Sequence, residues 1–110
     1  MDKRKKERLE AAGWKVGSTQ ELLGLTPEEA TFVEIKLALA RSLKHRRQAR
    51  KWTQTQVARR IDSSQSRVAK MEAADPSVSL DLLVRALLAL GASNRDVARI
   101  IDTGQREHAA

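Results

Sequence analysis

The feature that most constrains the fold is a pair of short helical segments in residues 53–73, separated by a tight turn. Thr53 is an N-cap residue for a first helix over 54–60, because its hydroxyl can accept a backbone hydrogen bond. Ser63 or Ser64 can cap the second helix, which is expected to run to about residue 73. In this layout one helix buttresses the other.

The two segments carry the residues that a close helix crossing requires. Ala58 supplies a small side chain at the contact, and Asp62 stands where the chain must bend sharply. Asp tolerates the left-handed backbone of such a bend better than most residues do. The positions expected to be buried are all apolar and correctly spaced: Val57, Ile61, Val68 and Met71.

A long helix is predicted over residues 27–50, ahead of this pair. Thr26 is its N-cap, Pro27 occupies the first helical position, and Glu29 completes a capping box. Apolar residues follow at helical spacing and form a broad stripe, whereas Lys36 falls largely outside it. The stripe comprises Phe32, Ile35, Leu39 and Leu43, with Val33, Leu37 and Ala40 beside them.

Two more helices are predicted after the pair. A helix capped by Ser79 ends at Gly91, because glycine commonly terminates helices. A final helix over residues 94–101 follows Ser93, and residues 102–110 are expected to fray.

The chain is therefore predicted to be all-α, because no sustained alternation of the kind that marks strands is present. Residues 32–101 form the main domain, and 102–110 form the frayed tail. Residues 1–31 form a helical N-terminal extension, with short helical segments expected over 3–12 and 18–23.

Composition excludes several functions. A chain of 110 residues is one domain plus a short arm, with a core too small for an enclosed cofactor pocket. It has no cysteine, so disulfides, thiolate metal sites and cysteine nucleophiles are excluded. His45 and His108 are isolated, so no metal, no cofactor and no catalysis are expected, and no small-molecule substrate. No apolar stretch is long enough to span a membrane, and a reducing cytoplasm is the expected location.

The charge distribution points to a partner. The net charge is +7, and the segment from Lys36 to Arg60 holds nine Lys or Arg residues and no Asp or Glu. A segment of one sign attracts a polyanion, and double-stranded DNA is the commonest candidate. The alternative is a solvated basic face without a partner.

Several short motifs resemble a known family. They are Arg-Lys-Trp-Thr-Gln followed by Val-Ala, then Ser-Ser-Gln-Ser-Arg-Val, Met-Glu, and Val-Ser-Leu-Asp-Leu-Leu leading to Ala-Leu-Gly. Residues 43–90 thereby resemble the helix-turn-helix domain of the phage repressor and Cro class, the XRE family. The resemblance implies a five-helix, phage-repressor-like DNA-binding domain. Asp62 departs from the pattern, because that family most often has Gly there.

The resemblance also implies which residues contact DNA. The second helix of the pair would enter the major groove, where a Gln can bond adenine N6 and N7 together. The residues expected at the bases are Ser64, Gln65, Ser66, Arg67 and Lys70, with the backbone as an alternative for Arg67 and Lys70. The residues expected at phosphates are Gln54, Arg50, Lys51 and Thr53.

Two further assignments follow from the resemblance. Arg47 and Glu72 match a structural ion pair of the family. The last helix is a common dimer contact in phage-repressor-like proteins, which points to a homodimer formed through Val97, Ile100 and Ile101. The N-terminal arm, rich in apolar residues, is the competing dimer surface.

The layout of a small domain behind an N-terminal extension is similar to antitoxins of the HigA type. That similarity implies a repressor of its own operon and a cognate toxin protein as a partner. The alternative function is a protein-interaction module that binds a toxin or another partner, with DNA binding secondary.

Overall fold

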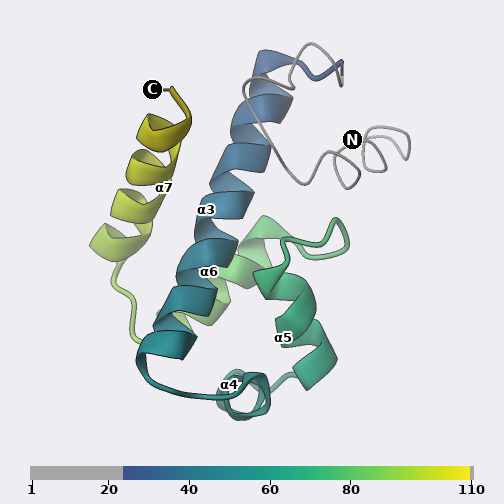
Figure 1. The fold of residues 1–110 in the computed structure, drawn as a ribbon, viewed down its shortest axis with the longest axis vertical. Helices are drawn as coiled ribbons and strands as arrows, with labels where there is room; N and C mark the ends of the chain where they lie inside the picture. Colours follow the sequence, from purple (N-terminus) through teal and green to yellow (C-terminus); the bar gives the residue numbers. More distant parts are fainter. Residues whose placement is uncertain (1–23, 110) are drawn as a thin grey trace.

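The computed structural model describes residues 24–109, together with the side chains of residues 24–104. This part of the chain is helical and contains no strand, which confirms the predicted all-α class (Figure 1). None of its helices combines the length and the apolar character needed to cross a membrane. The expected helical segments at 3–12 and 18–23 lie outside the described residues. The helices are α3 (Pro27–Ala49), α4 (Gln54–Arg60), α5 (Gln65–Glu72), α6 (Leu80–Ala89) and α7 (Asn94–Ala109).

The long helix α3 is the scaffold of the fold. It runs through the middle of the molecule, with α7 packed along one side and α5 on the other (Figure 1). Helix α6 also packs on α3, and α4 is attached mainly through α5. The core is aliphatic, and its largest fully buried side chains are Leu39, Leu43, Met71, Leu83, Leu87, Val33, Val57 and Val68.

The helices begin where the sequence predicts. Thr26 and Glu29 form a reciprocal capping box, with hydrogen bonds of 3.0 and 3.1 Å between side chain and backbone. Thr53 does the same with Gln56. Of the two serines that could cap α5, Ser64 is the N-cap. The remaining helices begin after Ser79 and Ser93, whose hydroxyls accept backbone hydrogen bonds from Leu82 and Asp96.

Four consecutive helices end in the same Schellman geometry, in which a residue with left-handed backbone lets the chain turn back on the last helical carbonyls. Only one of the four uses glycine, namely Gly91 with a φ of 98°. The others are Lys51 (φ 58°), Asp62 (φ 55°) and Ala74 (φ 53°). Asp62 therefore adopts the left-handed bend expected of it. Each turn is closed by a hydrogen bond of 2.8 to 3.1 Å from a backbone amide to the carbonyl five residues earlier. The donor and acceptor residues are Trp52 and Arg47, Ser63 and Ala58, Asp75 and Lys70, and Ala92 and Leu87.

The prediction that the last helix stops at residue 101 is wrong, because α7 continues to Ala109. Gly104 does not terminate the helix. It lies against α3, so close that a Cβ atom built on it would meet the Cβ of Ala38 at 2.5 Å. The glycine allows the two helices to approach each other closely. This contact lies beyond residue 101, in the segment that the sequence predicts to be frayed.

Two side chains of α3 also differ from the predicted stripe. Phe32, expected in the core, is 45 % exposed, whereas Lys36, expected outside the stripe, is only 6 % exposed. Lys36 is accommodated because its ammonium group donates a 2.9 Å hydrogen bond to the carbonyl of Asp75. The hydrogen bond attaches α3 to the loop between α5 and α6. The helical spacing of apolar residues in the sequence does not reveal such a bond.

Replacing the exposed Lys51 by Gly should raise the free energy of unfolding by about 0.5–1 kcal/mol. Glycine adopts the left-handed backbone without the Cβ clash, and this gain exceeds the extra entropy of its unfolded chain. Urea denaturation measures the change. The control is Lys51→Ala, which keeps the Cβ atom and should give no gain. Equal effects of the two substitutions would contradict the backbone explanation.

Candidate nucleic-acid interface

The first turn of α5 is open to solvent. Gln65, Ser66 and Arg67 are exposed there, and Lys70 is exposed in the last turn of the helix, as base or phosphate contacts would have to be. Ser64 is exposed too, but its Oγ accepts a 3.2 Å hydrogen bond from the Arg67 amide. The hydroxyl of Ser64 thus holds the helix start in place.

Arg47 and Glu72 lie together at the junction of α3 and α5. Arg47 Nε and Nη2 donate to the two carboxylate oxygens of Glu72 at 2.6 and 3.0 Å, which is a bidentate pair. The side chains are 14 % and 4 % exposed. The hydrogen bond to Glu72 raises the pKa of Arg47 above its ordinary value, against the lowering effect of burial. Arg47 also donates to the carbonyl of Trp52 at 3.0 Å, so it fixes the turn that leads into α4.

A chain of hydrogen bonds continues from this ion pair to the exposed end of α5. Gln54 Nε2 donates to Glu72 Oε1 at 3.1 Å, and Gln65 Nε2 donates to Gln54 Oε1 at 2.7 Å. We refer to Arg47, Glu72, Gln54 and Gln65 as the polar chain. Gln54 is expected to contact a phosphate. It has one amide N–H left for this contact, because its other N–H and its carbonyl oxygen are bonded within the protein.

The donors and acceptors of the polar chain follow from its charged end. A carboxylate only accepts, so Gln54 must turn its NH₂ group toward Glu72. Its carbonyl then faces Gln65, which must present its own NH₂ group. Gln65 is left with a carbonyl oxygen and one N–H for an external partner. A buried ion pair thereby sets the orientation of an exposed amide, and two glutamines at the first position of neighbouring helices are the sequence signal for it.

The residues expected at phosphates surround the start of α4. Thr53 uses its hydroxyl to cap α4, accepting from the Gln56 amide at 3.1 Å. Arg50 and Lys51 are exposed. The guanidinium of Arg50 lies 5.2 Å from the ring centroid of Trp52, and that of Arg60 lies 3.9 Å from it. Such cation–π contacts hold both cations near this end of the motif, and Arg60 is a positively charged residue that the sequence reasoning did not single out.

A second missed residue is Ser77, in the loop between α5 and α6. It shares a hollow of about 320 Å³ with the α5 N-cap Ser64 and with three residues of α5 itself, Ser66, Arg67 and Lys70. Its amide and hydroxyl both donate to Asp75 Oδ1, at 2.9 and 2.6 Å. The hydrogen bonds from Ser77 lower the pKa of Asp75 below its ordinary value. The loop follows α5 directly in sequence, and this adjacency is the signal that could have identified Ser77 as part of the interface.

The three apolar residues expected at a dimer contact lie along α7. Val97, Ile100 and Ile101 are each half-buried and pack against the core of their own chain. They complete the contact between α7 and the rest of the domain, so only part of each side chain is available to a second copy.

A family model described as a helix-turn-helix domain matches residues 38–100. The match spans more than half of the chain, so this protein belongs to that helix-turn-helix family. The domain points to DNA as the partner and to regulation of transcription as the process. No curated protein and no solved structure matches the chain.

Removing either partner of the Arg47–Glu72 pair should destabilise the protein by about 3–5 kcal/mol, because it leaves the other charge buried without compensation. The double variant Arg47→Ala/Glu72→Ala should lose less than the sum of the two single variants. Urea denaturation of all four proteins gives the coupling energy.

The control for this cycle is the ion pair of Asp81 and Arg85, whose side chains are 78 % and 76 % exposed at a distance of 3.7 Å. Its coupling should stay within about 0.5 kcal/mol. Additive losses at Arg47 and Glu72 would show that the buried pair contributes no more than the exposed one.

Proposed function

We propose that this protein is a sequence-specific regulator of transcription that reads the major groove of duplex DNA with the first turn of α5. The observation that carries the proposal is the polar chain, which runs from the buried Arg47–Glu72 pair to the exposed amide of Gln65. An exposed amide held by a buried network is organised for an external partner before that partner arrives.

The free groups of Gln65 suit adenine. Its remaining N–H can donate to adenine N7, and its Oε1 can accept from the N6 amino group, a pairing that distinguishes adenine from the other bases. Ser66 is exposed beside Gln65 and can bond either partner of several base pairs. Arg50, Lys51 and Lys70 supply positive charge for the flanking phosphates and position the helix without reading sequence.

The regulator acts as a homodimer in this proposal. One α5 reads only a few base pairs, and a second copy doubles the number at a two-fold operator. Its half-sites should lie about 34 Å apart, one turn of DNA. The partly exposed strip of Val97, Ile100 and Ile101 on α7 is the proposed contact between the copies.

The proposed regulator is a repressor, and the similarity to HigA-type antitoxins favours a toxin protein as its second partner. The apolar residues in the sequence of the N-terminal extension support this role, because a toxin could bind to them. A gene for a small basic ribonuclease-like protein beside this one would support the antitoxin role. A neighbour of unrelated type would count against it.

Gln65→Ala should weaken binding to the selected operator by about 1–3 kcal/mol per half-site and relax the preference at one base pair. Gln54→Ala should relax the preference at the same base pair, because Gln54 orients Gln65. Arg50→Gln should instead weaken all sequences alike and reduce the salt slope by about one. Fluorescence anisotropy with matched and mismatched duplexes, at several salt concentrations, separates the two kinds of loss.

The control is Arg95→Gln, which removes one exposed charge on α7 and should leave base preference unchanged. If Gln65→Ala leaves both affinity and preference untouched, α5 does not read the bases. That result, together with weak and unselective binding by the unmodified protein, would favour the protein-interaction module.

Ala98→Arg should convert the dimer into a folded monomer. Ala98 is exposed on α7 one turn before Ile101, so a long charged side chain there blocks the proposed contact without entering the core. Light scattering gives the mass and circular dichroism the helix content. Ala89→Arg, on the exposed side of α6, is the control and should stay dimeric. A dimer that survives Ala98→Arg would move the interface to the N-terminal arm.

A further inference from the structure

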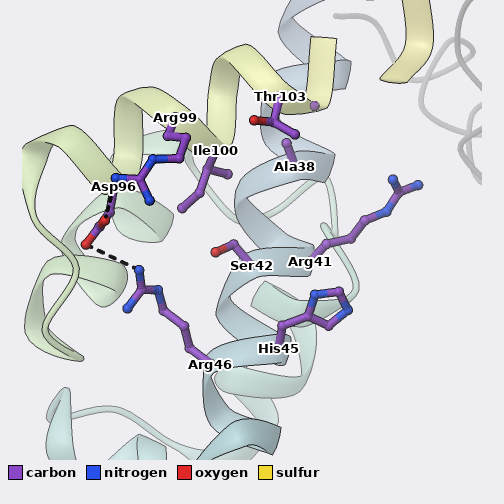
Figure 2. Close-up of a pocket in the computed structure, with 10 residues that line it drawn as sticks. Ala38, Arg41, Ser42, His45, Arg46, Asp96, Arg99, Ile100 and Thr103 are labelled. Atoms are coloured by element: carbon purple, nitrogen blue, oxygen red, sulfur yellow. Dashed lines mark ion pairs between the residues drawn. The ribbon is translucent and has the colours of Figure 1, made fainter. Parts of the chain in front are cut away.

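A hollow of about 280 Å³ lies between α3 and α7, and we call it the α3–α7 hollow. One end is closed where Gly104 contacts Ala38, and the other where Arg46 pairs with Asp96 at 3.4 Å. Between these contacts the helices leave space (Figure 2). The lining residues come from one face of each helix: Ala38, Arg41, Ser42, His45 and Arg46 of α3, and Asp96, Arg99, Ile100, Thr103 and Gly104 of α7.

Positive charge dominates this hollow. Three guanidinium groups line it, with Asp96 as the one carboxylate among its described lining residues. Figure 2 shows Arg41 and His45 extending from α3 on one side, while Arg46 and Arg99 approach Asp96 on the other. The two guanidinium groups that converge at the hollow are therefore those of Arg46 and Arg99, one from each helix.

The carboxylate of Asp96 is already engaged. Its Oδ2 accepts from the Ser93 amide at 2.9 Å and lies 3.4 Å from Arg46, and its Oδ1 lies 3.3 Å from Arg99. The bonds from Ser93 lower the pKa of Asp96 below its ordinary value. Arg46 Nε is buried without a hydrogen-bond acceptor among the described residues. The three guanidinium groups that line the hollow thus have one carboxylate among its described lining residues.

The rest of the lining combines apolar and hydroxyl groups. Ala38 and Ile100 offer apolar surface, and Ser42 and Thr103 offer hydroxyls that can donate to an oxyanion. The volume is near the lower limit of small-molecule sites, so it suits a compact small molecule rather than a nucleic acid. The hollow also lies on the opposite side of α3 from α5 (Figure 1).

We propose that the α3–α7 hollow binds a small organic anion, a carboxylate or phosphate monoester with a compact apolar group. Arg46 and Arg99, which converge beside Asp96 from α3 and α7 (Figure 2), hold the anionic group, because guanidinium forks match both carboxylate and phosphate oxygens. The apolar group lies on Ala38 and Ile100. The site is separate from the base-reading surface, so it stands whether or not the proposed DNA function is correct.

Titration of the full chain with phenyl phosphate, followed by ¹H–¹⁵N NMR in the absence of DNA, tests the proposal. The amide signals of Ser42, Arg99 and Thr103 should shift and saturate. Phenyl phosphate should bind about tenfold more tightly than inorganic phosphate, which lacks the apolar group, and benzyl alcohol should not bind. Benzoate in place of phenyl phosphate shows whether a carboxylate is accepted equally.

Matched variants locate the site. Arg99→Gln and Arg46→Gln should each weaken binding of phenyl phosphate about tenfold, whereas Arg95→Gln and Lys44→Gln should leave it unchanged. Arg95 and Lys44 are exposed on the same two helices but do not line the hollow. Equal losses in all four variants, shifts that do not saturate, or shifts at residues 64–70 would overturn the proposal, the last by placing the anion on the DNA-reading surface. Equal affinity for inorganic phosphate would overturn the organic part of it.

Discussion

The buried ion pair of Arg47 and Glu72 is the interaction on which the geometry of this domain depends. It joins the end of α3 to the end of α5, and through the carbonyl of Trp52 it also holds the turn into α4. Taking two charges out of water is costly, so a well-packed apolar pair would serve stability as well. The ion pair provides direction instead, because a carboxylate accepts hydrogen bonds and cannot donate them. The order of donors and acceptors is thereby fixed at Gln54 and then at Gln65, which lies at the surface of the protein.

Most of the fold is predictable from the sequence because local signals and packing agree in it. Thr26 and Thr53 each supply a capping hydroxyl, and the box partner stands three residues later, so the helix starts follow from short-range chemistry. The buried Val57, Val68 and Met71 follow from helical spacing. Such signals require no knowledge of which helices meet.

The features that sequence reasoning misses all depend on contacts between distant residues. Glycine often ends a helix, yet the position of Gly104 against Ala38 makes it a packing residue within α7. Lys36 lies off the apolar stripe by composition, but a carbonyl 39 residues away makes its burial possible. Within the interface, the exposed α5 start is predictable from its motif. The link from Gln54 to Gln65 and the contribution of Ser77 appear only when α4, α5 and the following loop are placed together.

The contact of Gly104 with Ala38 has a consequence for the space beside it. Only the methyl group of Ala38 lies between the two helices at this point, so their backbones largely fix their separation. Gly104 and Ala38 therefore set the width of the α3–α7 hollow from one of its ends. A bulkier residue at either position would act as a wedge and widen the gap along its whole length. A substitution at Gly104 can therefore change the width of this space without altering the arginines that would hold a ligand.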